Sequence, residues 1–405
     1  MIEVMASTPL GPAYHRLWTA TALSNFGDGI RSAALPLLAA SITTDPVLVA
    51  GVAVAGQLPW LLLGLAAGAL VDRFDQRRLA VLVDCGRTVA LGALIVAAAT
   101  GNATVAWIYA VAFLCGVGET LRDTATATLL PPLVADTDLE RANGRLVNAE
   151  VAGNELIGPP VGGYLFGVAV VLPFAVNGGV LALAAALIFS LPNVFAPARD
   201  GERKGRIWGD TVAGLRWLAG QRRMLTLTLL SGLFAFADSM WFVVLVLYVQ
   251  QVLLLPAAAY GLLVGVGALG GLAGGFLAGR IARATGPAVA LAGCFAAGAV
   301  GQLLLGLTSE VVVAGLGLVV TSGAFGVWAV VARTLRQRST PRELLGRVTS
   351  SATTVVMTAS PLGALIGGLI GAEFGLRAPI LIGVPALAVG ACVAYAVLRD
   401  KPRSP

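Results

Sequence analysis

The chain has 405 residues, of which 57% are hydrophobic and 12% are charged, and its formal net charge is +6. Soluble proteins carry charge on about 25% of their residues, so this chain has too few polar side chains to cover a folded surface in water. Its apolar content also excludes a disordered chain, which leaves the lipid bilayer as its solvent.

Apolar runs divide the chain into segments that are long enough to cross a bilayer, which requires about 20 mainly apolar residues per helix. The predicted segments are 14–41, 46–71, 79–99, 104–125, 141–167, 169–191, 224–252, 256–280, 286–307, 311–333, 345–371 and 376–398. The sequence therefore predicts an all-α membrane protein with twelve transmembrane helices.

Basic residues gather in every second connection between these segments. With a cytoplasmic N-terminus, nearly all Lys and Arg lie in cytoplasmic connections, and the outer connections carry only Arg377. This bias is the one described by the positive-inside rule. We therefore expect an inner or plasma membrane protein with both termini in the cytoplasm, and we interpret its positive charge as facing the membrane rather than nucleic acid.

The first segment carries a polar stripe. Thr21, Asn25, Asp28 and Ser32 fall at helical spacing, and Arg31 follows Asp28 by three residues. An ionised side chain at the bilayer centre costs about 2.5–3.5 kcal/mol, so these groups should avoid lipid. We expect the stripe to line water or substrate, with Asp28 exchanging a proton or pairing with substrate. A static Asp28–Arg31 bridge is the alternative.

A second group of polar and charged residues lies near the cytoplasmic ends of segments two to four. Its members are Gly68, Asp72, Arg73, Arg77 and Arg78 around the loop after segment two, Asp84 and Arg87 in segment three, and Glu119, Arg122 and Asp123 in segment four. We predict that the residues around the loop form a cytoplasmic gate together with Glu119, Arg122 and Asp123. Simple anchoring by positive charge is the alternative for the arginines.

The fifth segment combines two acids with small residues. Glu150 is spaced to pair with Asn154, and Glu155 lies one helical turn before Pro159, so either acid is a candidate proton carrier. Glycines allow a neighbouring helix to approach closely, and proline kinks a helix. The small residues and the proline of this segment are Gly144, Gly153, Gly158, Pro159, Gly162 and Gly163, and segment eight offers a matching face at Gly267, Gly271, Gly275 and Gly279.

A polar connection separates the two halves of the chain. It begins with a stretch rich in proline, glycine and charge, and it continues at 207–221 with apolar residues at helical spacing. This pattern predicts a linker followed by an amphipathic helix on the membrane. We expect an N-terminal six-helix bundle at 1–191, the linker at 192–223 and a C-terminal six-helix bundle at 224–405.

Three short patterns recur in the same order in both halves. They are Phe26-Gly-Asp28 with Phe236-Ala-Asp238, Gly68-x-Leu70-x-x-Arg73 with Gly275-x-Leu277-x-x-Arg280, and Gly144-Arg145 before Pro159 with Gly346-Arg347 before Pro361. Repeats of the same orientation are related by an axis along the membrane normal. We therefore expect the two bundles to show pseudo-two-fold symmetry.

Asp238, the counterpart of Asp28, lies in the seventh segment. Phe234 and Trp241 flank it at helical spacing. An acid beside aromatic rings suits an amphipathic or cationic substrate, because both groups attract cations. Packing of these rings in the core or against lipid is the alternative.

The loop after segment two resembles a signature of the major facilitator superfamily. Its sequence, Gly68-Ala-Leu-Val-Asp72-Arg73-Phe-Asp75-Gln-Arg77-Arg78, is similar to G-x-x-x-D-R-x-G-R-R. Asp75 replaces a glycine of that signature, as in the branch of macrolide-efflux and siderophore-export proteins. The glycine–proline pattern of segment five resembles the antiporter motif of proton-driven exporters, with plain helix packing as the alternative.

This resemblance implies the major facilitator fold and alternating-access secondary transport, driven by a proton gradient without a cofactor. It also implies that Asp72 and Arg73 brace the two halves in the outward-open state, a role that we extend by position to Arg122 and Asp123. The expected substrate is a small, partly hydrophobic molecule such as a drug, macrolide, siderophore or secreted metabolite.

Several other functions lack their sequence signals. The chain contains no phosphate-binding loop for ATP and no hydrolase motif, and its single histidine and four scattered cysteines form no metal-binding pattern. We expect a monomeric transporter with the bilayer and a small molecule as partners, rather than an enzyme. The alternatives are a proton-coupled importer of a small organic solute, and a membrane receptor or assembly factor that transports nothing.

Overall fold

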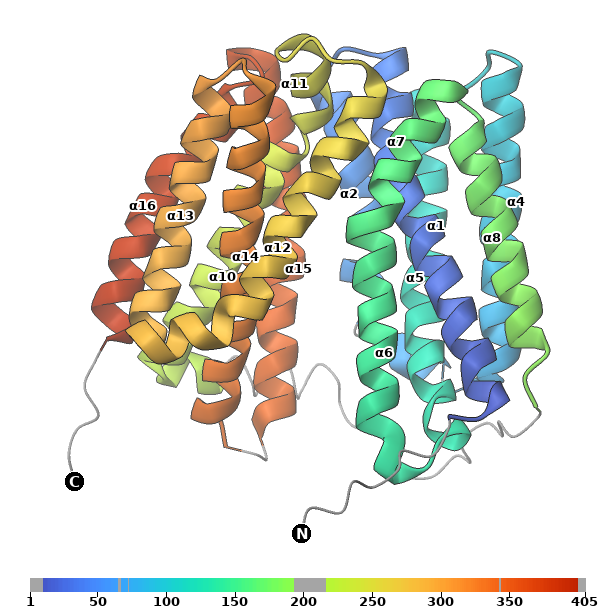
Figure 1. Cartoon of the computed structure of the whole chain (residues 1–405), viewed down its shortest axis with the longest axis horizontal. Helices are drawn as coiled ribbons and strands as arrows, with labels where there is room; N and C mark the ends of the chain where they lie inside the picture. Colours follow the sequence, from blue (N-terminus) through green and yellow to red (C-terminus); the bar gives the residue numbers. More distant parts are fainter. Residues whose placement is uncertain (1–9, 65–66, 72, 193–215, 342–343, 400–405) are drawn as a thin grey trace.

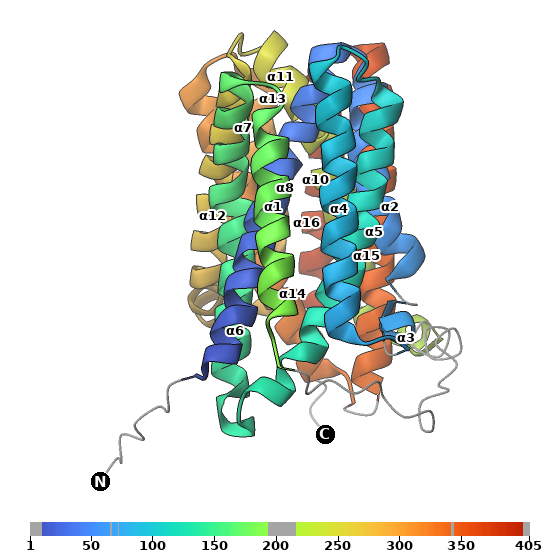
Figure 2. The ribbon, with the colours of Figure 1, turned by 90° about the vertical axis from the view of Figure 1, so that its right-hand side faces the viewer.

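The computed structural model describes residues 10–64, 67–71, 73–192, 216–341 and 344–399, and every regular element in these ranges is helical. The helices form two bundles that stand side by side, one from each half of the sequence (Figure 1). The start of the first helix and the end of the last helix, which are the described parts next to the termini, lie at the same end of the molecule (Figure 2).

The first bundle contains the helices of the N-terminal half. They are α1 (Pro12–Ile42), α2 (Pro46–Leu63), α3 (Ala67–Val71), α4 (Gln76–Ala99), α5 (Val105–Leu129), α6 (Leu139–Val151), α7 (Gly158–Val168) and α8 (Leu172–Phe189), with short 3-10 turns η1 (Pro131–Leu133) and η2 (Asp136–Asp138). A π-helix, η3 (Ala152–Ile157), joins α6 to α7.

The second bundle contains the helices of the C-terminal half. They are α10 (Arg222–Phe242), α11 (Leu245–Gln251), α12 (Ala257–Thr285), α13 (Pro287–Leu307), α14 (Val311–Ser339), α15 (Leu345–Phe374) and α16 (Ala378–Leu398). The predicted amphipathic helix at 207–221 lies mostly outside the described residues, which show helix at 216–220.

Helices lie over all twelve predicted segments, although three segments are divided, at α2 and α3, at α6 to α7, and at α10 and α11. Within the described ranges, 10 helical segments are long and apolar enough to cross a membrane. The predicted segments outside this set are α1, which contains Asp28 and Arg31, and the divided α6–η3–α7. The all-α membrane fold is confirmed, and the count of twelve membrane spans stays a prediction.

Helix starts follow from local capping. Asp45 precedes α2, and its Oδ1 accepts a hydrogen bond from the backbone N–H of Val47 at 2.8 Å. Asp75 caps α4 in the same way, through the N–H of Arg78 at 3.0 Å. An N-cap of this kind is worth about 1 kcal/mol. The aspartate that departs from the family signature therefore starts the helix after the loop.

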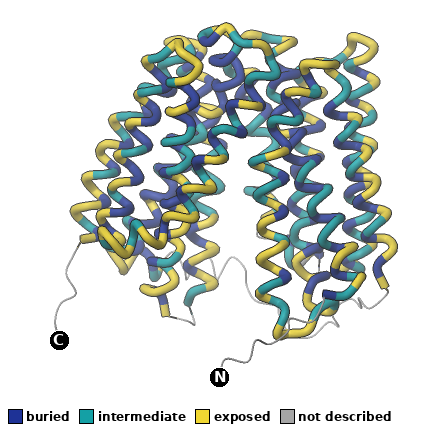
Figure 3. Tube along the Cα trace, viewed as in Figure 1, coloured by how far each residue is buried: buried dark blue, intermediate teal, exposed yellow. Residues whose placement is uncertain are grey.

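Large apolar side chains cover the outer faces of the bundles, where Figure 3 shows the exposed residues of the outer helices. Val89, Phe276 and Val312 are 71%, 76% and 76% exposed. Water would disfavour so many exposed apolar groups, whereas lipid tails solvate them. These faces are therefore the membrane-contacting surface.

The bundles touch at the end opposite the termini and diverge toward the termini (Figures 1 and 3). On one side α7 meets α12, where a Cβ on Gly163 would lie 2.9 Å from the Cα of Gly261. On the other side α2 meets α15, where a Cβ on Gly368 would lie 3.2 Å from the Cα of Val47. Glycine permits both contacts because it has no side chain in the way.

Candidate functional site

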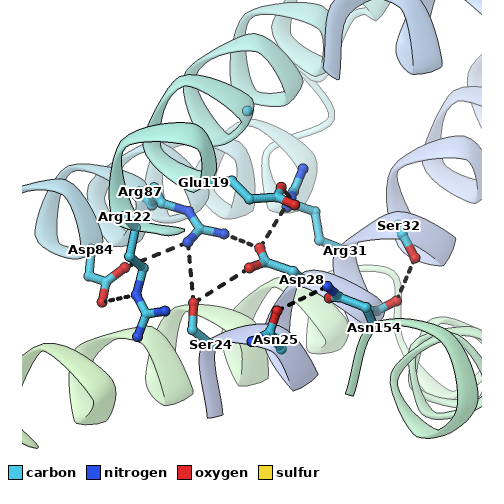
Figure 4. A network of polar contacts seen from close by, with 12 residues as sticks. Ser24, Asn25, Asp28, Arg31, Ser32, Asp84, Arg87, Glu119, Arg122 and Asn154 are labelled. Atoms are coloured by element: carbon cyan, nitrogen blue, oxygen red, sulfur yellow. Dashed lines mark hydrogen bonds and ion pairs between the residues drawn. The ribbon is translucent and has the colours of Figure 1, made fainter. Parts of the chain in front are cut away.

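Six charged side chains form a connected cluster inside the N-terminal bundle (Figure 4), which we call the charge network. Its members are Asp28 and Arg31 on α1, Asp84 and Arg87 on α4, and Glu119 and Arg122 on α5. Three carboxylates balance three guanidinium groups. The network is therefore formally neutral although it lies within helices that cross the membrane.

Asp28 contacts two arginines of the charge network through one carboxylate oxygen. Its Oδ1 accepts a hydrogen bond from Arg31 Nη2 at 3.1 Å and another from Arg87 Nη2. Ser24, one turn earlier on α1, lies 3.5 Å from Oδ2 of the same carboxylate. Asp28 is 5% exposed, so protein groups rather than water surround it.

Glu119 is the member at the more exposed side of the charge network. Arg31 Nη2 donates to Glu119 Oε2 at 2.6 Å, a short charge-assisted hydrogen bond. The Glu119 side chain is 24% exposed, against 9% for Arg31. Of the six members, Glu119 therefore has the greatest access to the surroundings of the bundle.

The third carboxylate, Asp84, is fully buried between α4 and α5. Arg122 Nε donates to Asp84 Oδ2 at 2.9 Å, and Arg87 Nη1 lies 3.6 Å from Oδ1. Arg122 also donates to the backbone carbonyl of Ala20 at 3.0 Å, which connects α5 to α1. Such burial is tolerated because each charge has an opposite charge beside it.

Glu119 and Arg122 belong to a different cluster from the one that the sequence predicted. The sequence grouped them with the arginines of the cytoplasmic gate, whereas the structure connects both to Asp28 through the charge network. They lie one turn apart on α5, a spacing that directs both into the same bundle. Asp123 is partly buried, and no ion pair of Asp123 occurs in the described part of the chain.

The predicted polar stripe of α1 is largely engaged by protein partners. Asn25 is 6% exposed, and its Oδ1 accepts a hydrogen bond from Asn154 Nδ2 of η3 at 3.0 Å. The expected pairing of Asn154 with Glu150 is therefore replaced by this bond between helices. Thr21 is also buried, and Ser32 is the exposed member of the stripe.

The π-helix η3 contains Glu155, one of the two residues that were expected on one face of segment five. Its backbone bonds include Gly158 N–H to Gly153 O, which spans one residue more than an α-helical bond. Glu155 is nevertheless exposed, whereas Pro159 is buried. Glu150 is exposed as well, and the expectation of a shared Glu155–Pro159 face is wrong.

The glycines of segment five allow close helix contacts. A Cβ on Gly153, Gly158 or Gly162 would lie 2.5–2.7 Å from the nearest backbone atom of α1, at residues 26, 29 and 30 respectively. Gly144 differs, because a Cβ there meets nothing within 4 Å. The motif-like glycines after Gly144 are thus required by packing against α1 and, at Gly163, against α12.

The matching glycine face on α12 differs from the predicted one. Gly261 and Gly265 face α7, and Cβ atoms on them would touch Pro159 and Pro160. Gly267 and Gly271 instead face Ser322 of α14. The predicted face of Gly267, Gly271, Gly275 and Gly279 is therefore wrong as the partner of segment five, since it packs within its own bundle or meets no neighbouring helix.

The loop after α2 presents arginines at the end where the termini lie. Arg77 donates to the backbone carbonyl of Leu191, and its guanidinium lies 5.4 Å from the Phe189 ring centroid. Arg73 is exposed, and the Arg78 side chain is 77% exposed beside Asp75. Gly68 lies in α3. Asp72, the other expected gate residue, lies outside the described residues.

Asp238 in the C-terminal bundle has a different environment from Asp28. Trp241 Nε1 donates to its Oδ1 at 3.2 Å, and the carboxylate is partly buried. No Lys, Arg or His forms an ion pair with Asp238 among the residues that the structure describes. Phe234, one turn earlier, stacks on Trp328 with ring centroids 5.7 Å apart. A tryptophan and an aromatic cluster thus accompany an acid without a protein cation.

The sequence reasoning missed two residues of the charge network as site candidates. Asp84 and Arg87 were placed near the gate, although opposite charges three residues apart on an apolar helix already indicate a buried pair. Ser24 gave no signal of its own, because its contact with Arg87 at 3.4 Å depends on how α1 meets α4.

The sequence model of the Major Facilitator Superfamily matches residues 17–364. The chain belongs to this superfamily. It is therefore a multi-pass membrane protein of a transporter family, and the resemblance in the loop after α2 is confirmed.

Curated relatives of this superfamily member include efflux transporters. The multidrug efflux pump Tap of Mycobacterium tuberculosis (strain ATCC 25618 / H37Rv) is 28% identical over 412 residues, which cover 95% of this chain and 93% of that protein. The enterobactin exporter EntS of Shigella boydii serotype 4 is 26% identical over 367 residues, covering 88% and 85%. The expected similarity to efflux proteins is confirmed.

Solved structures show the same fold. A bacterial homologue of the iron transporter ferroportin in an inward-facing state superposes with a TM-score of 0.74 at 16% identity, covering 95% of this chain and 98% of that one. A bacterial homologue of the lysosomal transporter Spinster, inward-facing and unoccupied, gives a TM-score of 0.73 at 15% identity, covering 96% and 97%. The predicted major facilitator fold is confirmed.

Proposed function

We propose that this protein exports a small, partly hydrophobic molecule in exchange for protons, as a monomer, without a cofactor or ATP. The observation that carries the proposal is the contrast between its two halves. Asp28 is compensated by Arg31 and Arg87, whereas Asp238 has no cationic partner in the described part of the protein. A cation that arrives from outside the protein is the natural partner for Asp238.

The environment of Asp238 favours a cationic or neutral substrate. An ionised group within the membrane costs about 2.5–3.5 kcal/mol unless it is compensated. A proton or a cationic substrate group each provides that compensation, and the two exclude one another at one carboxylate. Trp241 and Phe234 are each 2% exposed, so their rings pack in the core beside Asp238, as the alternative for these rings expected.

Because Asp238 binds either a proton or the substrate, alternation between the inward-open and outward-open states exchanges the one for the other. Asp238 binds the substrate when it is accessible from the cytoplasm and releases a proton there. On the outer side a proton displaces the substrate, and the protonated carboxyl returns. Each cycle moves the substrate outward and protons inward, so the proton gradient drives export.

We infer that both termini are cytoplasmic and that the protein lies in the cell membrane. The divergent end of the bundles carries most of the described arginines outside the charge network, which fits a cytoplasmic end under the positive-inside rule. They include Arg73, Arg77, Arg78, Arg280, Arg283, Arg333, Arg336 and Arg338. The arrangement in Figure 1 then corresponds to bundles parted on the cytoplasmic side.

We assign the proton and substrate exchange to Asp238 rather than to Asp28. Release of Asp28 for exchange requires two arginines to move away from it. The structure thus favours the static alternative for Asp28, in which it joins α1 to α4. Glu119, which is more exposed, is the network member that can respond to the solvent on the open side.

The test uses accumulation of a fluorescent lipophilic cation in cells that express the wild type, Asp238→Asn or Glu310→Gln. Glu310 is an exposed acid beside the start of α14 and serves as the matched control. We expect low accumulation with the wild type and Glu310→Gln, and high accumulation with Asp238→Asn. Higher accumulation with the wild type than with empty cells would indicate import, and equal accumulation would indicate a protein that does not transport this class.

A further inference from the structure

A hollow of about 470 Å³ lies on the N-terminal bundle between α1 and α6, at the end where the termini lie. Figures 1 and 2 show the first turns of α1 beside α6 at this place. Its wall includes Tyr14, His15 and Trp18 from α1 and Arg145 and Asn148 from α6. The charge network and Asp238 contribute nothing to it, so it is separate from the proposed exchange site.

The position of the hollow coincides with the headgroup layer of the membrane. Helix α1 has 31 residues and is therefore about 46 Å long, whereas the hydrocarbon core of a bilayer is about 30 Å thick. Each end of α1 extends about 8 Å beyond that core if the helix is centred. Residues 14–18 lie in the first two turns, so they are at the level of the lipid headgroups.

The hollow combines a free cation with ordered aromatic walls. Arg145 is exposed, and its guanidinium makes no hydrogen bond or ion pair within the described ranges. Trp18 Nε1 donates to the backbone carbonyl of Arg145 at 3.1 Å, and Tyr14 Oη donates to that of Ala142 at 3.2 Å. These two hydrogen bonds connect α1 to α6 and hold in place the part of α6 that carries Arg145.

The remaining polar groups are also suited to an anion. His15 and Asn148 are exposed at the hollow and can both donate hydrogen bonds, whereas no Asp or Glu lines it. A guanidinium binds phosphate through parallel hydrogen bonds, and Tyr and Trp are preferred at the membrane interface. Basic pockets between transmembrane helices bind the headgroups of anionic lipids.

We propose that this hollow is a binding site for the phosphate of an anionic phospholipid headgroup. Arg145 binds the phosphate, His15 and Asn148 donate to its oxygens or to the glycerol, and Trp18 contacts the glycerol region. The acyl chains then lie along the apolar outer surface of the bundle, where Val147 is 54% exposed. Lipid bound in this way bridges α1 and α6, the two helices that lead into Asn25 and η3.

The test is a titration of the full-length protein in neutral detergent, followed by native mass spectrometry. The added molecules are dioleoyl phosphatidylglycerol, dioleoyl phosphatidylcholine or glycerol 3-phosphate. We expect the wild type to retain one phosphatidylglycerol more tightly than phosphatidylcholine. Arg145→Gln should weaken that retention about fivefold, the ratio that corresponds to about 1 kcal/mol for one basic residue near anionic lipid.

Two further variants distinguish lipid binding in the hollow from a general attraction of the lipid to exposed arginines. Arg283→Gln removes an exposed arginine at the end of α12, outside the hollow, and should leave the tight phosphatidylglycerol in place. Ala152→Leu keeps Arg145 and fills part of the hollow, so it should weaken retention as well. This second variant acts through volume and does not depend on the folding of Arg145→Gln.

Three results would overturn the proposal. They are equal retention of phosphatidylglycerol and phosphatidylcholine by the wild type, equal weakening by Arg145→Gln and Arg283→Gln, and binding of glycerol 3-phosphate as tight as that of the lipid. The last result would identify a site for soluble phosphate compounds instead.

Discussion

Arg87 is the residue on which the charge network depends most directly. Its side chain is 1% exposed, and it contacts Asp28, Asp84 and Ser24, so it joins α4 to α1. A buried ion pair adds little net stability over an apolar core, but removing one partner leaves an uncompensated charge. We therefore expect a large loss of stability when one member of the charge network is removed.

We predict that Arg87→Gln lowers the free energy of unfolding by about 3–5 kcal/mol, because it leaves the carboxylates of the network in excess. The measurement is the melting temperature of the purified protein in detergent. Arg78→Gln is the matched control, since this exposed side chain should contribute less than about 0.5 kcal/mol. Equal melting temperatures for the two variants would contradict the role given to Arg87.

The contact between Asp28 and Arg87 allows a second stability prediction. Asp28→Asn and Arg87→Gln each unbalance the network, whereas the double variant restores its formal neutrality. We predict that the double variant is more stable than the sum of the single effects by about 0.5–3 kcal/mol. Strictly additive effects, measured in the same melting experiment, would show that the two side chains do not interact.

The sequence predicted only the local contacts of this network. Asp28 and Arg31 are three residues apart on one helix, so their pairing followed from helical spacing. The bond from Arg87 to Asp28 joins residues 59 positions apart and depends on how two helices pack. No pattern within a single sequence specifies that contact, which is why Glu119 and Arg122 were assigned to the gate.

At the scale of whole helices, hydropathy predicted the position of each segment because lipid requires long apolar runs. Hydropathy did not predict the π-helix η3, since one extra residue in a turn leaves the composition unchanged. Nor did it predict that Glu155 is exposed while Pro159 is buried. The choice of Gly261 and Gly265 as the partners of α7 also depends on tertiary packing.

The α7–α12 contact gives a prediction about conformation. Gly261→Val places side-chain atoms where the backbone of Pro159 and Gly163 now lies, so the bundles cannot remain this close at the end opposite the termini. We predict a shift toward states that are open at that end, measured as a longer distance between spin labels on the outer ends of α7 and α12. Gly144→Ala, which meets nothing within 4 Å, should leave the distance unchanged.

At the scale of the whole molecule, two halves of similar fold differ in charge. The N-terminal bundle contains three balanced carboxylate–guanidinium pairs, and the C-terminal bundle contains Asp238 beside Trp241 without a basic partner among the described residues. The internal repeat aligned Asp28 with Asp238 but did not reveal this difference. In our account the first half keeps a fixed structure and the second half exchanges cations.

This division predicts how substitutions affect different substrates. Asp238→Asn should raise the concentration of a cationic substrate needed for half-maximal transport by about tenfold or more, since a hydrogen bond to a charged group is worth about 1.5–3 kcal/mol. Binding of a neutral substrate of similar size should change little, because it makes no ion pair with Asp238. Equal losses for both substrates, measured by uptake into inside-out vesicles, would contradict a charge-selective role.

The most direct test of the central claim follows protons and substrate together. The protein is reconstituted into liposomes that contain a pH-sensitive dye, and a lipophilic cation is added outside without any imposed gradient. We predict that wild-type protein moves protons in the direction opposite to the cation and that Asp238→Asn abolishes this proton movement. Cation transport by the wild type without proton movement, or unchanged proton movement with Asp238→Asn, would contradict the account.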